Sequence, residues 1–73
     1  MLFEERQGVL WSLRARRSTA KCVLHSDASW AELLILQDEE IAFRESFPDA
    51  FTARLRATAL HQRLIDKGWK ETG

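Results

Sequence analysis

Cys22 and His25 are the pair of side chains in this 73-residue sequence that could serve as a nucleophile and its base. A histidine within hydrogen-bond reach activates a thiol for nucleophilic catalysis. Both residues fall in the segment AKCVLHSD, whose alternating apolar residues predict a strand. Side chains three positions apart on a strand project from opposite faces, so these two groups are kept apart. We therefore expect Cys22 to be a buried, inert core residue and His25 to be a surface histidine.

Other constellations that carry chemistry are missing from the sequence. Its three glycines are scattered, so no phosphate-binding loop can form, and no nucleophile elbow appears. His25 and His61 lack the spacing of zinc ligands. The acidic run at 38–40 is more typical of a solvated turn than of a metal site. We expect a chain that is not an enzyme and that holds no metal or cofactor.

Cationic side chains gather in the stretch RARRSTAK at 14–21. If strand alternation holds through the turn, Arg14, Arg16 and Lys21 project away from the sheet face that a C-terminal helix is expected to cover, toward the side of His25 and Arg44. The candidate nucleic-acid or partner surface comprises Arg14, Arg16, Arg17, Lys21, His25 and Arg44. The alternative interpretation is a solvated hairpin tip, where basic residues oppose edge pairing and keep a small protein soluble.

The overall charge does not favour strong nonspecific binding to nucleic acid. Eleven basic and eleven acidic residues give a net charge of zero. Residues 1–25 hold five basic and two acidic side chains, residues 26–49 hold one and seven, and residues 50–73 hold five and two. Binding to phosphates would therefore depend on a local basic patch.

The elements that position these side chains follow from the hydrophobic period, which changes near Pro48 from two to about 3.6. Four alternating segments before Pro48 predict strands, and their short polar connections favour antiparallel hairpins. These segments lie at 8–15, 20–27, 31–37 and 40–47. The QDEE turn lacks glycine, so we expect Asp38 to adopt the left-handed conformation.

One helix is predicted after the strands. Ser46 followed by Asp49 resembles a capping box at its start. Gly68 supplies a left-handed stop at its end, and Trp69 is expected to fold back onto Leu64. The sequence therefore predicts an α+β fold in ββββα order, with an antiparallel meander of three to four strands packed on one C-terminal helix.

The chain is expected to form one domain over residues 1–73. Its predicted parts are an N-terminal tail or short extension at 1–7, strands at 8–47, a helix at 48–67 and a C-terminal tail at 68–73. A domain this small buries only about 60% of the surface of its unfolded chain, so good packing or self-association must stabilise it.

Apolar side chains remain after a core is assigned. The helix-covered face of the sheet is expected to carry Trp11, Leu13, Cys22, Leu24, Leu33, Ile35, Ile41 and Phe43. The side of the helix that is predicted to face the sheet carries Ala50, Ala53, Ala57, Leu60 and Leu64. Phe51 and Leu55 lie well round the helix from this stripe, so the apolar arc of the helix is wider than usual. Alternation places Leu10, Val23, Leu34 and Leu36 on the opposite face of the sheet. The predicted dimer or partner contacts are these four residues together with Phe51 and Leu55.

Trp11 and Leu13 form a W-x-L pattern in the first strand, Cys22 lies in the second, and the helix ends in Gly68-Trp69. Over most of the chain this combination resembles a group of small uncharacterised bacterial single-domain proteins, a resemblance that implies no known activity. The order of elements alone is similar to that of the single-stranded DNA-binding transcriptional coactivators and the Whirly proteins. That likeness implies dimers that bind strands on a sheet surface, and it carries over no site residues.

Two function hypotheses follow. The first is a non-enzymatic bacterial domain that acts as a homodimer or binds another protein. The alternative is binding of single-stranded nucleic acid on the open basic face, where Trp30 could add a stacking platform. A single cysteine suits a reducing compartment, and no segment approaches the roughly 20 apolar residues of a membrane span. The start MLFEERQ lacks the features of a secretion signal, so we expect a cytoplasmic protein without a membrane partner.

Overall fold

The computed structural model describes residues 6–72 of the chain, with side chains described from residue 8 onward. The bounds are β1 Arg6–Ala15, β2 Ser18–Ser26, β3 Ala31–Gln37, β4 Glu40–Phe47, α1 Ala50–Asp66 and β5 Lys70–Glu71. Of the predicted N-terminal extension at 1–7, residues 1–5 lie outside the described residues and the last two begin β1.

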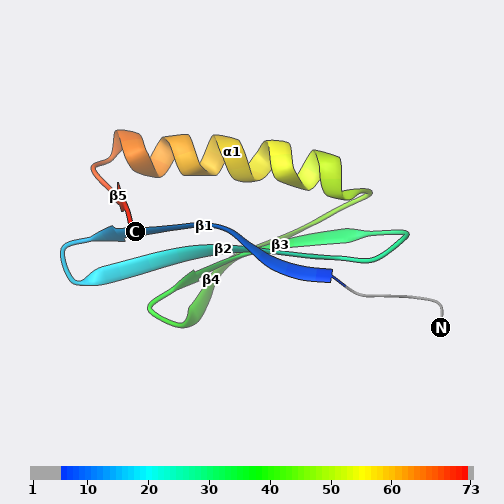
Figure 1. The fold of residues 1–73 in the computed structure, drawn as a ribbon, viewed down its shortest axis with the longest axis horizontal. Helices are drawn as coiled ribbons and strands as arrows, with labels where there is room; N and C mark the ends of the chain where they lie inside the picture. The colour runs from blue at the N-terminus through cyan, green and yellow to red at the C-terminus, as the bar shows by residue number, and fades with distance from the viewer. Residues whose placement is uncertain (1–5, 73) are drawn as a thin grey trace.

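The strands form one antiparallel sheet in the order β4-β3-β2-β1-β5. The predicted meander packed on one C-terminal helix is confirmed. Figure 1 shows α1 lying along one side of this sheet. Within residues 6–72 no helix or strand lies over the other side, which we call the open face. The fold therefore has two layers, and one core lies between them.

β5 is the element that the sequence does not predict, because Lys70 and Glu71 carry no apolar alternation. In place of the predicted tail at 68–73, these two residues pair with the end of β1. The Glu71 carboxylate lies within hydrogen-bond distance of His61 on α1, with 2.6 Å between its oxygen and Nε2 of the ring. β5 thus joins the end of the helix to the edge of the sheet.

Two register shifts change which side chains face α1. In β1 the shift lies between Val9 and Trp11, and Leu10 packs against the core together with Trp11. In β4 the shift places Ile41 opposite Leu36 on the open face, where Ile41 is 54% exposed. The predictions of Leu10 on the open face and Ile41 on the helix-covered face are therefore wrong, because an extra residue at a bulge breaks strict alternation.

Asp49 caps the N-terminus of α1. Its carboxylate accepts the Thr52 backbone N–H at 2.7 Å. This hydrogen bond lowers the pKa of the Asp49 carboxyl from its ordinary value of 3.8. The predicted cap at Ser46 is wrong, because Ser46 still belongs to β4 and the chain leaves the extended conformation only after Asp49.

The C-terminus of α1 ends as the sequence predicts. Gly68 has a φ of 104° and its N–H donates to the Ile65 carbonyl at 3.0 Å. The Trp69 N–H reaches back to the Leu64 carbonyl at 3.0 Å. These two bonds are those of a Schellman motif, in which a left-handed glycine satisfies carbonyls that the helix leaves unpaired.

Small helix residues let α1 lie close to the sheet. Ala53 is fully buried and Ala57 is 1% exposed. The indole N–H of Trp11 donates to the Ala57 carbonyl at 3.0 Å, which ties β1 to the middle of α1. The core cluster consists of Ala20, Cys22, Leu24, Ala31, Leu33, Ile35, Ala53 and Ala57. The alternation read from the sequence therefore places the sheet half of the core correctly, apart from the two bulged positions.

Candidate interaction surfaces

Cys22 and His25 stay apart, as the strand alternation predicts. Cys22 is fully buried between the sheet and α1, and this burial raises the pKa of its thiol to about 11. His25 lies opposite Glu32 on the open face. A deeply buried thiol with a raised pKa is a poor nucleophile. The predicted role of Cys22 as a buried core residue is confirmed, and its burial separates it from the one histidine on its own strand.

Trp30 has a structural setting that the sequence does not reveal. Its backbone N–H donates to the Asp27 carboxylate at 3.2 Å, and its carbonyl accepts the Asp27 N–H at 3.0 Å. The indole meets the His25 ring edge-on, with centroids 5.1 Å apart at 82°. The Asp27 carboxylate thus shapes the β2–β3 connection, and the Trp30 ring packs beside His25 at one end of the open face.

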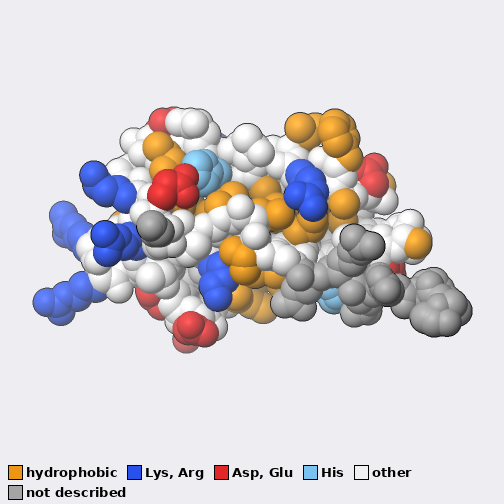
Figure 2. All heavy atoms as spheres, in the orientation of Figure 1, with side chains coloured by type: hydrophobic (Ala, Val, Ile, Leu, Met, Phe, Trp, Pro, Cys, Tyr) orange, Lys and Arg blue, Asp and Glu red, His pale blue; other side chains and the backbone are white. Residues whose placement is uncertain are grey.

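The basic stretch divides between a turn and the open face. Arg16 and Arg17 form the β1–β2 turn, and Arg16 has a φ of 56°. Arg14 and Lys21 share the open face, and β5 adds Lys70 directly opposite Arg14. Figure 2 shows basic side chains gathered at the end of the molecule that carries the β1–β2 turn. Arg14, Lys21 and Lys70 therefore share one face of the sheet. The sequence does not predict that Lys70 belongs to this face.

The other two predicted basic positions do not extend this cluster. Arg44 makes an ion pair with Glu32 at 3.3 Å, so its charge is locally balanced. His25 lies beside Glu32 toward the opposite end of β2 from Lys21. The apolar residues Val23 and Leu34 lie between the two ends of the face. The six predicted residues therefore form no continuous basic strip.

Apolar side chains occupy the middle of the open face. We call this set the apolar patch, and it consists of Val9, Val23, Leu34, Leu36 and Ile41. Val9, Val23 and Leu34 follow one another across β1, β2 and β3, and Leu36 pairs with Ile41 across β3 and β4. Val9 is 56% exposed and Ile41 is 54% exposed, whereas Val23 is only 4% exposed. Leu34 and Leu36 are half-buried, and together with the two exposed residues they extend apolar surface from β1 to β4, as a candidate contact surface would.

The second exposed apolar surface lies on the outer side of α1. Phe51 is 71% exposed and Leu55 is 58% exposed, while Ala53 and Ala57 of the same helix are buried. Figure 2 shows apolar side chains standing on the helix at the end where α1 begins. The helix and sheet separate this pair from the apolar patch, so a single contact cannot bury both surfaces.

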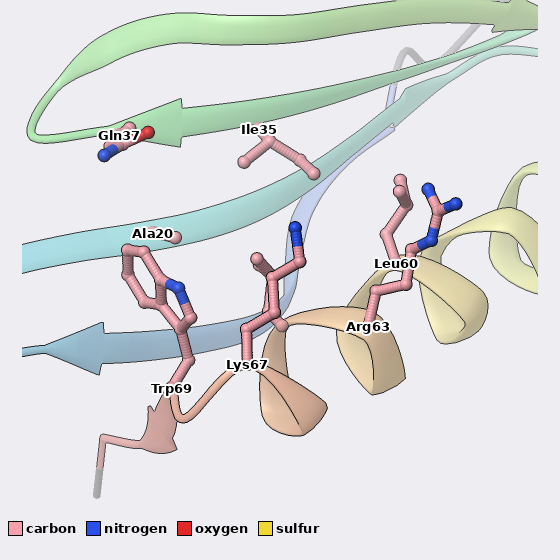
Figure 3. Close-up of a pocket in the computed structure, with 8 residues that line it drawn as sticks. Ala20, Ile35, Gln37, Leu60, Arg63, Lys67 and Trp69 are labelled. Carbon is pink, nitrogen blue, oxygen red and sulfur yellow. The ribbon is translucent and has the colours of Figure 1, made fainter.

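A cavity lies under the C-terminal half of α1. Its sheet side is formed by Ala20, Ile35 and Gln37, and Trp69 closes one end. Its volume is about 190 Å³. Figure 3 shows Leu60 lining the helix side. The cavity is a partly open, mainly apolar hollow at the edge of the core, on the side of the sheet away from the apolar patch.

Arg63 and Lys67 stand at this cavity. Both side chains extend from α1 toward the sheet (Figure 3). Among residues 6–72, neither has an acidic partner within ion-pair distance. The sequence signal for this site is weak, because basic residues in the last turn of a helix are common for their interaction with the helix dipole.

The part of the chain that the structure describes contains no cluster of three or more His, Cys, Asp or Glu side chains placed to hold a metal ion. In the same part, α1 is too short and too polar to cross a bilayer. Comparisons with protein-family models, curated proteins and solved structures found no match to this chain.

The faces on which three surface residues lie could not be predicted from the sequence, because each of them depends on how two strands pair. Val9 and Ile41 lie beside bulges, whose positions depend on how two strands pair. Lys70 joins the open face through β5, which forms only because the helix end returns the chain to β1. Gly68 is the one local signal for this return, since it ends the helix.

Proposed function

We propose that this chain is a small non-enzymatic interaction domain that pairs with a second copy of itself through the open face of its sheet. The observation that carries the proposal is the apolar patch, in which Val9 and Ile41 are more than half exposed on a face that no described element covers. An antiparallel sheet that meets water on one side normally presents polar residues there. Covering the patch removes this apolar area from water.

A second copy is the occupant that the size of the chain favours. A 73-residue domain has little core, and its described residues hold neither a disulfide nor a metal cluster. Two-fold dimers are the commonest oligomers, and their interfaces place one patch against its own copy. Two sheets packed face to face would bury both apolar patches in one layer.

The charged residues around the patch fit the rim of such an interface. Arg44 and Glu32 are already paired, so they can stay at the edge without an unbalanced charge. Arg14 and Lys70 lie toward one end of the face, and Lys21 lies beside Leu36 at the margin of the patch, where its long side chain can reach water. We place the domain in the cytoplasm, because its one thiol is free and buried and suits a reducing compartment.

The test compares the masses of two charged variants by light scattering during gel filtration. Ile41→Lys places a charge in the apolar patch at a site that is 54% exposed, and Phe51→Lys places the same charge on α1 at a site that is 71% exposed. We expect two-chain particles for the parent chain and Phe51→Lys, and particles of one 8.5 kDa chain for Ile41→Lys. Circular dichroism checks that both variants fold. A parent chain of one-chain mass, or dissociation by Phe51→Lys instead, contradicts the proposal.

A second candidate function is binding of single-stranded nucleic acid. It is favoured by Lys70, which β5 places beside Arg14 on the face that already carries Lys21. Contacts of this kind weaken steeply as salt rises. Fluorescence anisotropy of a labelled oligonucleotide at about 50 mM salt tests it, because phosphate contacts are strong in that regime. Binding that Lys70→Gln weakens and Arg54→Gln leaves unchanged supports this function, and absent binding excludes it.

A further inference from the structure

We propose that the cavity between the C-terminal half of α1 and the sheet binds a small carboxylate that carries one aromatic ring or one branched aliphatic group. This site lies on the helix side of the sheet and involves none of the residues of the apolar patch. The inference therefore does not depend on the dimer proposed above.

The size and lining of the cavity set the apolar part of the ligand. A volume of about 190 Å³ is below the roughly 300 Å³ at which pockets for drug-sized ligands begin. It exceeds the roughly 150 Å³ of an engineered apolar cavity that takes up benzene. Ile35, Leu60, Leu64 and Trp69 supply aliphatic and aromatic walls. One ring or one branched chain fills this space.

The charges at the cavity set the polar part of the ligand. Arg63 and Lys67 lie one helical turn apart, and both extend from α1 toward the sheet (Figure 3). Their charges have no acidic counterpart among residues 6–72. A guanidinium and an ammonium together favour a carboxylate, whose two oxygens accept hydrogen bonds from both. No acidic side chain lines the cavity, so a cationic ligand is disfavoured.

Three small compounds test the charge and the apolar group of this ligand separately. Acetate presents the same charge without a group to fill the cavity, and phenethylamine presents the same ring with the opposite charge. Phenylacetate combines both features. Titrating the full chain with each compound and following backbone amide shifts by NMR gives an affinity and a location together.

We expect phenylacetate to give saturable shifts centred on Ile35, Leu60 and Trp69, and to bind at least about tenfold more tightly than acetate or phenethylamine. The double variant Arg63→Gln and Lys67→Gln should weaken phenylacetate by about tenfold. Arg54→Gln removes an exposed helix cation away from the cavity and should leave its affinity unchanged. The inference is overturned if phenylacetate produces no saturable shifts, if phenethylamine binds equally well, or if Arg54→Gln weakens binding as much as the double variant.

Discussion

At the scale of single residues, the β3–β4 turn holds two acidic residues in an unusual conformation. Asp38 and Glu39 have φ values of 52° and 75°. Two successive positive φ values are typical of a type I′ turn, which prefers Asn-Gly or Asp-Gly. The conformation of Asp38 is stabilised by its side chain, because its carboxylate accepts the Thr19 backbone N–H at 3.0 Å. Among the hydrogen bonds found in residues 6–72, none stabilises the positive φ of Glu39 in this way.

The Glu39→Gly variant is therefore expected to be more stable than the parent chain. Glycine adopts a φ of 75° without the steric cost that a Cβ brings. We expect the free energy of unfolding in urea to rise by about 0.5–1 kcal/mol, after the greater entropy of glycine in the unfolded chain is subtracted. Glu40→Gly, within β4, should lower it instead. A loss of stability in Glu39→Gly would argue against the turn described here.

Cys22 gives the folded chain a dependence on alkaline pH. The pKa of the thiol is raised by burial from 9.0 to about 11, so the folded state retains a proton that the unfolded state loses. Stability is fully present below pH 9.0 and declines as the pH rises toward about 11. The loss approaches about 1.4 kcal/mol per pH unit within this window.

Urea unfolding between pH 8 and 10.5 measures this effect, because that range spans most of the interval between the two pKa values. Cys22→Ala is the matched control, since it lacks the titrating thiol while other alkaline titrations remain. We expect the parent chain to lose stability more steeply than Cys22→Ala above pH 9. Parallel curves would mean that the thiol is not buried as described.

At the scale of elements, the strands could be read from the sequence because their apolar residues alternate. The face of the sheet onto which each side chain projects could be predicted from the sequence only as far as the next bulge. Leu10 and Ile41 both lie beside register shifts, and each faces the side opposite to its prediction. Alternation is a local property of one strand, whereas a bulge is decided by the pairing of two strands.

The C-terminal turn of α1 is the element whose sequence signal and structure agree most closely. Gly68 has a φ of 104°, and a Cβ placed there would meet nothing within 4 Å. The cost of Gly68→Ala is therefore backbone strain without a steric clash, and we expect the free energy of unfolding to fall by about 1–2 kcal/mol. Gly8→Ala is the control, because Gly8 also has open space around its Cβ position but no positive φ. Equal effects of the two substitutions would contradict the Schellman motif.

At the scale of the whole molecule, the sequence predicts a sheet with one face against a helix and leaves the composition of the other face only partly resolved. Leu34 and Leu36 on that face follow from alternation alone. Val9 and Ile41 complete the apolar patch only through the two bulges. The cavity was beyond sequence-based reasoning, because it depends on how far α1 stands from β2 and β3.

In the proposed dimer, the open face of one chain contacts the open face of another. An isotope-filtered NOE experiment on a mixture of labelled and unlabelled chains observes such contacts directly, because it detects only protons of different chains that lie close together. We expect intermolecular NOEs among the methyl groups of Val9, Leu34 and Ile41. Intermolecular NOEs from Phe51 and Leu55 in their place, or none at a concentration well above that used for mass measurement, would contradict it.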